Sequence, residues 1–450
     1  MSDDVSDRPP APGQPEPTAG SGADPGTQPG AGLTGREPGG RSPLRGLGRA
    51  ILDSILEGSP TVTTTLAFIA ALVIGALVIA FSNPTVLHYW NSFFAAPGTA
   101  ISSTWDSIAA AYSAMFEGAI FNPHTIAAAA NGTGSVGAIF YPLSQTTAQA
   151  TPLILTGLSV ALAFRAGLFN IGAASQWIGG AIVVTWLGFG VSLPPVIHVI
   201  VCLAGGFAGG AVMGWLVGAL KARTGAHEVI VTIMLNYVMY DVLSYLLGTP
   251  KALQLPHQAD LISPGIAANA QLPHVGGPAP QVGVGFLIAI AAAIAMWWLL
   301  ARSTTGFQFR TVGANPSAAR TAGMSVEKTW VLAMLLAGGL AGLSGAVTTQ
   351  GVFYNLNSQS YGSYGINGIT VALLGRAKPL GTVLAALLFG ALEAGGTVME
   401  AATTVPIDIV EVLQGLIVLF VAAPLMIRAV FRLRAAQSTG MEAVAKGWNG

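Results

Sequence analysis

Residues 303–329 read STTGFQFRTVGANPSAARTAGMSVEKT, a polar segment that separates two long apolar regions. The TTG at 304–306 is typical of a helix break, so a polar arm is expected there. Asn315 and Pro316 then open a short helix, because asparagine caps helix N-termini and proline fits the first helical position. Gly323 is the predicted C-cap. The segment therefore predicts a short amphipathic helix between two polar arms, although a plain connector between membrane spans fits the pattern equally well.

The composition places the chain in a membrane. Of its 450 residues, 52% are hydrophobic and 8% are charged, and the mean hydropathy is +0.63. Soluble domains carry roughly 25% charged residues, so we expect an integral membrane protein. The net charge of zero supports no nucleic-acid partner. The single cysteine, Cys202, cannot form an intrachain disulfide or anchor a usual zinc site alone, so no metal or cofactor is predicted.

The predicted organisation has three parts. Residues 1–58 are rich in proline, glycine and acidic residues and are predicted to be a disordered cytoplasmic tail. Within them, 44–57 can form a short amphipathic helix at the membrane surface. Residues 59–429 form the predicted transmembrane domain, which contains the loop 303–328. Residues 430–450 form a second predicted cytoplasmic tail.

Apolar runs long enough to cross about 30 Å of hydrocarbon predict an all-α polytopic membrane protein with about ten membrane segments. Two runs, 150–164 and 362–376, are short for this task and are expected to need surrounding protein. The aromatic-rich residues 83–149 are predicted to form interfacial helices on the outer side. The ten predicted segments are 61–82, 150–164, 168–189, 195–220, 229–248, 283–301, 329–349, 362–376, 379–397 and 406–427.

The distribution of lysine and arginine predicts the orientation, because cationic residues near span ends stay on the cytoplasmic side. With an even number of spans and the N-terminus inside, the outer connectors contain only Lys251 of the 19 basic residues. The N and C termini are therefore predicted to be cytoplasmic, and so is the loop 303–328.

The spans also suggest an internal repeat. Residues 150–248 and 329–427 each contain four predicted segments, which begin from opposite sides of the membrane and would be related by inversion. Each group has an Asn/Gly break, FNIG at 169–172 and GING at 365–368. Irregular backbone at bilayer depth is tolerated where it lines protein or water, so a pathway is predicted there. Close helix packing and hydrogen bonding between helices is the alternative. The predicted pathway residues are Asn170, Gln176, Trp177, Asn236, Tyr237 and Asn367.

The sequence contains no sign of an enzyme. No lysine follows a glycine, so a Walker A nucleotide-binding loop cannot form in this chain. His227 and Glu228 begin a pair found in zinc proteases, but Val231 stands where the second histidine is needed. If ATP powers this protein, another polypeptide must bind it.

Four separated stretches, in order, resemble a known family. They are FRAGLFNIG at 164–172 with Gln176; EVI at 228–230 with TIMLNY at 232–237; the stretch from Arg310 to Met324; and GI at 368–369 with VALLGR at 371–376 and PLG at 379–381. Over roughly 145–428 the chain resembles the membrane permeases of bacterial ABC importers for branched-chain amino acids, ribose and nucleosides. It looks closest to the simple-sugar and guanosine-type nucleoside branch. One departure is Ala174-Ser175, where the family has an acidic residue and glycine.

The resemblance implies a role in the bacterial cytoplasmic membrane and several partners. The short helix in 303–328 would be a coupling helix that docks on a separate ATPase subunit, with Arg310, Asn315, Ala318, Ala319 and Gly323 at the contact. Small residues there would allow a partner surface to approach closely. A second permease subunit, identical or different, and an extracytoplasmic substrate-binding protein are also implied.

The predicted function is import of a nucleoside or simple sugar, because amides and aromatic rings suit hydroxyls and bases better than charges do. A pentose or a branched-chain amino acid is the alternative within the same class. An ion-coupled or proton-coupled secondary transporter using Asp241 and Glu393 is an alternative from another class, and it needs no ATPase. A membrane scaffold without transport would leave the polar segment and the paired breaks unexplained.

Overall fold

The computed structural model describes residues 60–250, 252–255, 260–275, 282–358, 363–403, 405–423, 426 and 431. All of them belong to one unit, 54–450. The predicted N-terminal tail, its surface helix and almost all of the C-terminal tail lie outside the described residues. Helices dominate the described part, and the predicted all-helical class is confirmed.

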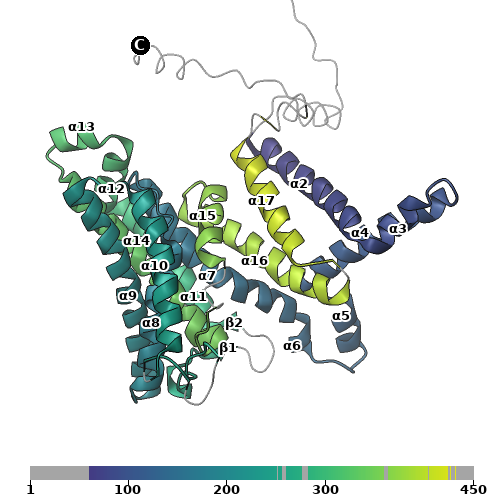
Figure 1. Cartoon of the computed structure of the whole chain (residues 1–450), viewed down its shortest axis with the longest axis horizontal. Helices are drawn as coiled ribbons and strands as arrows, with labels where there is room; N and C mark the ends of the chain where they lie inside the picture. The colour runs from purple at the N-terminus through teal and green to yellow at the C-terminus, as the bar shows by residue number, and fades with distance from the viewer. Residues whose placement is uncertain are drawn as a thin grey trace, which may run out of the picture. The chain divides into compact units, whose positions relative to one another are not determined.

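The helices follow one another along the chain as shown in Figure 1. The first half contains α2 (Pro60–Ser82), α3 (Pro84–Asn91), α4 (Pro97–Ala119), α5 (Pro123–Ala130), α6 (Val136–Ile139), α7 (Tyr141–Arg165), α8 (Ala173–Gly190), α9 (Pro195–Thr224) and α10 (Glu228–Gly248). The second half contains the 3-10 turn η1 (Ala268–Ala270), α11 (Val284–Arg302), α12 (Thr304–Ala314), α13 (Pro316–Thr321), α14 (Val326–Thr348), the π-turn η2 (Thr349–Phe353), α15 (Tyr364–Leu374), α16 (Pro379–Ala402) and α17 (Asp408–Ala422). Two short antiparallel strands, β1 (His274–Val275) and β2 (Val282–Gly283), pair before α11.

Seven of the described helices are long and apolar enough to cross a membrane: α2, α7, α9, α10, α11, α14 with η2, and α16. The predicted number was ten. The other three predicted segments contain α8, α15 and α17, whose lengths are 18, 11 and 15 residues. At 1.5 Å per residue, α15 covers only about half of the hydrocarbon layer. The inverted repeat and the orientation of the termini remain predictions.

Helix α7 corrects one predicted boundary. It begins at Tyr141, not at 150, and its 25 residues make it a full-length span where a short one was expected. The polar residues before 150 were assigned to the interfacial region, but their hydroxyls bond to backbone carbonyls. Thr147 Oγ1 donates to Ser144 O of the same helix at 2.8 Å, and Thr146 Oγ1 donates to Ala119 O of α4 at 2.6 Å. Because these hydroxyls are satisfied internally, polar residues continue the helix.

Glycines set the closest helix contact in the fold. Gly206, Gly210, Gly214 and Gly218 recur every four residues along α9, which predicts a packing face, and all four are buried against α14 or its neighbours. A Cβ on Gly210 would lie 2.5 Å from the Cα of Gly342 in α14, a distance that no side chain can occupy. The predicted packing role of this stripe is confirmed.

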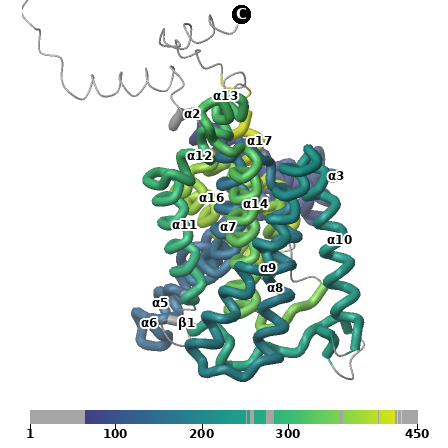
Figure 2. The backbone as a smooth tube through the Cα atoms, turned by 90° about the vertical axis from the view of Figure 1, so that its left-hand side faces the viewer, coloured from purple at the N-terminus to yellow at the C-terminus, as the bar shows by residue number. Residues whose placement is uncertain are grey.

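Helix α7 runs through the interior of the unit. It packs against α14, α15, α16 and α11, and most of its residues are buried. On one side of it, α8, α9 and α14 pack together, with α10 against α8; on the other side, α16 continues to α4 and to the pair α2 and α17 (Figures 1 and 2). Helices α12 and α13 lie at the end of the bundle where α11 ends and α14 begins.

Candidate functional site

The first arm of the polar segment is a helix. The predicted break at 304–306 is wrong, because these residues form the first turn of α12. Ser303 explains the difference: its Oγ accepts a hydrogen bond from Gly306 N at 2.9 Å and donates one to Leu299 O at 2.7 Å. A serine N-cap therefore starts a new helix immediately after α11. The polar residues mark a change of direction and not a loss of helix.

The short helix at the centre of the segment forms as predicted. Asn315 is the N-cap of α13, and its Oδ1 accepts a hydrogen bond from Ala318 N at 3.0 Å. Pro316 occupies the first helical position. The C-cap is Ala322, one residue before the predicted Gly323. Gly323 follows it with a left-handed φ of 81°, which glycine adopts without steric cost.

The residues predicted to couple to an ATPase divide into two groups. Ala319 is fully buried inside the chain, in a small apolar cluster with Val312 and Val326. Arg310, Asn315, Ala318 and Gly323 are exposed. The buried residue fastens α13 to the bundle, so only the exposed group can meet another molecule.

A contact between two glycines joins the polar segment to the break before α8. A Cβ on Gly313 in α12 would lie 2.8 Å from Gly167 N, and one on Gly167 would lie 2.9 Å from the Cα of Gly313. Gly167 also has a left-handed φ of 73°. The backbones of α12 and the 166–172 connection therefore touch directly.

A closed amide network holds the break itself. Asn170 Nδ2 donates to Gln176 Oε1 at 2.9 Å, and Gln176 Nε2 donates back to Asn170 Oδ1 at 3.0 Å. Asn236 of α10 bridges the same region: its Oδ1 accepts from Ser175 N and its Nδ2 donates to Ile171 O, each at 3.0 Å. Asn170 and Gln176 are completely buried. The structure thus brings together three predicted pathway residues, which here bind one another.

The remaining predicted pathway residues lie apart from this network. Trp177 is buried and stacks on Tyr364 of α15 with ring centroids 6.2 Å apart. Asn367 donates to Ser363 Oγ at 2.9 Å within its own turn. Tyr237 is 66% exposed on α10. The two predicted breaks are nevertheless neighbours, because a Cβ on Gly365 would lie 2.6 Å from the Cα of Ala174 in α8.

An ion pair reinforces the break from the side of α9. Lys221 Nζ lies 2.6 Å from Glu228 Oε2, and the other carboxylate oxygen accepts from Phe169 N at 3.4 Å. The Lys221 ammonium also lies 4.9 Å from the ring centroid of Trp330, at the start of α14. Sequence reasoning did not identify this pair. Its signal was a lone glutamate at the start of an apolar helix, close to a lysine at the end of the preceding one.

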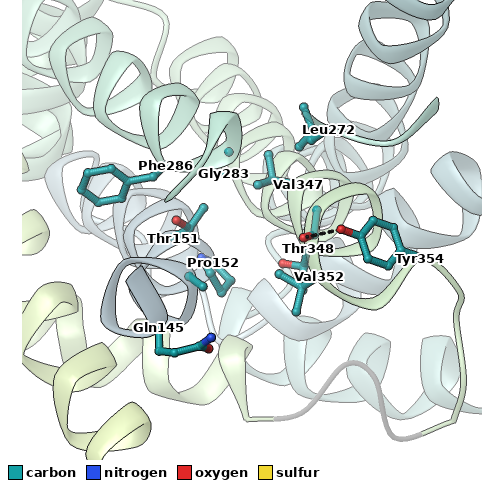
Figure 3. Close-up of a pocket in the computed structure, with 13 residues that line it drawn as sticks. Gln145, Thr151, Pro152, Leu272, Gly283, Phe286, Val347, Thr348, Val352 and Tyr354 are labelled. Atoms are coloured by element: carbon teal, nitrogen blue, oxygen red, sulfur yellow. Dashed lines mark hydrogen bonds between the residues drawn. The ribbon is translucent and has the colours of Figure 1, made fainter. Parts of the chain in front are cut away.

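Two cavities lie toward the Tyr141 end of α7, and none of the predicted pathway residues lines either. The first measures about 160 Å³ and is lined by residues of α7, α11, α14 and η2, among them Thr151, Thr348 and Tyr354 (Figure 3). Burial raises the pKa of the Tyr354 phenol, which stays a neutral donor and bonds to Gly351 O at 3.3 Å. The second measures about 410 Å³ and is lined by α4, α5, α6, α7 and α16. Gln145 lines both cavities.

The predicted lack of a metal site meets no contrary finding in the described part of the chain, where no three His, Cys, Asp or Glu residues cluster. The described residues thus provide a backbone contact between α12 and the 166–172 connection, and two cavities whose mostly apolar linings include polar side chains.

Comparison with known proteins identifies relatives of this chain. The family model described as branched-chain amino acid transport system / permease component matches residues 143–422. The guanosine ABC transporter permease protein NupP of Bacillus subtilis is 37% identical over 331 residues, covering 72% of this chain and 88% of the relative. The glucose ABC transporter permease protein TsgB13 of Haloferax volcanii is 35% identical over 297 residues, covering 62% and 76%. The guanosine ABC transporter permease protein NupQ of B. subtilis is 28% identical over 255 residues, covering 54% and 78%. No solved structure matches.

Proposed function

This chain belongs to the family of branched-chain amino acid transport system permease components, and from that membership we propose that it imports a nucleoside or a simple sugar, with a nucleoside preferred. It is a multi-pass membrane protein and a non-catalytic transmembrane subunit of an ABC transporter. The named guanosine and glucose permeases among its relatives support a hydroxylated substrate over a branched-chain amino acid.

The contact between Gly313 and Gly167 carries the mechanistic part of the proposal. The exposed residues of α13 dock on an ATPase subunit, and the Asn315 N-cap stabilises the start of that helix. When the ATPase moves α13 and α12, the 166–172 connection moves with them, because the two backbones have no space between them. The amide network of Asn170, Gln176 and Asn236 then opens or closes around the substrate pathway. Trp177, Tyr237 and Asn367 complete the proposed pathway.

A second permease subunit is supported by the surface of α10. This apolar helix exposes Tyr237, Asp241 and Tyr245, although it is long and apolar enough to cross a membrane. A carboxylate facing hydrocarbon is costly, so Asp241 requires protein or water beside it. The partner is the same chain or a paired permease; B. subtilis has two relatives of this chain with guanosine permease names. An extracytoplasmic binding protein delivers the substrate, and both termini are cytoplasmic.

The test compares two neighbouring substitutions in α13. Ala318 is exposed, so Ala318→Glu should leave the fold intact but block the ATPase by steric overlap and an unpaired charge. Ala319→Glu forces a carboxylate into the Val312–Val326 cluster and should detach α13 from the bundle. We expect Ala318→Glu to insert in normal amounts while losing both ATPase co-purification and uptake. Full uptake by this variant, with no ATPase recovered beside the unmodified chain, would favour a secondary transporter and refute the proposal.

A further inference from the structure

The second cavity is polar on several sides. Gln145 and Gln149 lie four residues apart on α7, so their side chains share one face of that helix. Glu117 of α4 lines the same cavity, as do Asn122 of α5 and Thr397 of α16. At about 410 Å³ the cavity falls in the size range of small-molecule sites, roughly 300–1,000 Å³.

Three of these polar groups have no partner within the described residues. Glu117, Gln145 and Gln149 are partly buried, and none of their side-chain atoms bonds to the protein in the described ranges. The Asn170–Gln176 pair differs, because those two amides satisfy each other. Groups that line a cavity without internal partners are available to a ligand or to water.

The charge of the residues that line the second cavity limits the chemical class of ligand that can bind there. Among the described residues, the lining contains a carboxylate and no lysine, arginine or histidine. A phosphate would therefore meet Glu117 without a compensating cation. Neighbouring hydroxyls fit well, since a glutamine amide both donates and accepts and a carboxylate accepts from two hydroxyls.

We propose that this cavity is a binding site for the neighbouring hydroxyls of an uncharged sugar ring, held by Glu117, Gln145 and Gln149. The inference rests on the proposed function and names the part of the substrate that this chain recognises. The ring belongs to a nucleoside or to a free sugar. Phosphorylated forms are excluded by the carboxylate.

Gln145 is shared by the two cavities. It lines the second cavity and also the first, where Thr151 lies six residues further along α7, about 9 Å at 1.5 Å per residue. A sugar ring that leaves Gln149 can keep one bond to Gln145, which also lines the first cavity. The first cavity also offers Thr348 from α14. In this proposal the sugar ring binds in the second cavity and then in the first, and residues of α7 line both.

The experiment measures competition for uptake of labelled guanosine by cells that contain the complete transporter. The competitors are unlabelled guanosine and 2′,3′-dideoxyguanosine, and the result is the inhibition constant of 2′,3′-dideoxyguanosine divided by that of guanosine. The binding protein also recognises the hydroxyls. Because the binding protein is the same in every strain, its contribution to the ratio of inhibition constants cancels when permease variants are compared. GMP should not compete in the unmodified strain, where the Glu117 carboxylate is present. Parallel competition by glucose and by ribose distinguishes a free sugar from a nucleoside.

In Gln149→Ala and Glu117→Ala the ratio should fall about five- to tenfold from its unmodified value, since each removes a hydrogen bond to a hydroxyl. Asp106→Asn is the matched control, because Asp106 is an exposed carboxylate on the same helix α4 that lines neither cavity. Gln145→Asn keeps the amide group on a shorter side chain. It is included as a conservative variant in case the alanine variants misfold. An unchanged ratio in well-inserted variants overturns the inference and leaves the proposed function standing. If the unmodified transporter takes up neither guanosine nor a sugar, the proposed function itself fails.

Discussion

The contact between Gly313 and Gly167 yields a sharp test of mechanical coupling. In Gly313→Ala the new methyl carbon would overlap the backbone oxygen of Arg165 and would lie 2.8 Å from Gly167 N and 3.0 Å from Ala166 C. Comfortable contacts need about 3.5 Å, so the two backbones must separate by about 0.7 Å or more. All three obstacles are backbone atoms, and no side chain can rotate away. Overpacking of this kind costs about 1–3 kcal/mol.

We expect Gly313→Ala to reduce transport and to leave assembly with the ATPase unchanged. A penalty of about 2 kcal/mol changes the equilibrium constant between α12 in contact with the 166–172 connection and α12 separated from it roughly 30-fold. The exposed face of α13 is untouched, so the ATPase should still co-purify and hydrolyse ATP. We expect uptake to fall at least tenfold while ATP hydrolysis continues, as measured in proteoliposomes.

Gly415→Ala on α17 is the matched control, because a Cβ there meets nothing within 4 Å. Its uptake should equal that of the unmodified protein. Gly167→Ala should repeat the loss, since it meets the same contact from the other side and adds strain at its left-handed φ. Normal uptake by Gly313→Ala, at normal protein levels, would refute the reasoning.

The remaining predictions concern the ion pair and the orientation. Lys221→Met takes the ammonium away from the buried Glu228 carboxylate and leaves it with the exposed His227 Nδ1 at 3.9 Å, which should destabilise the purified protein by about 3 kcal/mol and lower its melting temperature. Lys221→Met combined with Glu228→Gln should recover most of this loss, and equal stability of the single variant and the unmodified protein would contradict the role of the pair. For orientation, a cysteine at exposed Gln308 should be shielded from an impermeant thiol reagent in intact cells, while one at exposed Ala268 should react. Cys202 is buried and adds little background; labelling at Gln308 from outside would reverse the proposed topology.

Some features follow from the sequence alone because they depend on composition or on a few adjacent residues. The apolar content indicates a polytopic helical membrane protein without any tertiary information. Asn315 and Pro316 predict the start of α13 because capping acts within three residues. The glycine stripe of α9 predicts a packing face because its spacing is a property of one helix. The family motifs were likewise readable, and the family match agrees with them.

Other features depend on residues far apart in the chain, so tertiary structure alone decided them. Ala318 and Ala319 are identical side chains, and only packing against Val326 determines which is buried. Asn170 was predicted to line a pathway, but Gln176 and the fold around Ser159 supply its partners. Glu117 and Gln145 meet at one cavity because α4 and α7 converge there. Local patterns determine which helices form; burial and pairing arise only when helices distant in sequence come into contact.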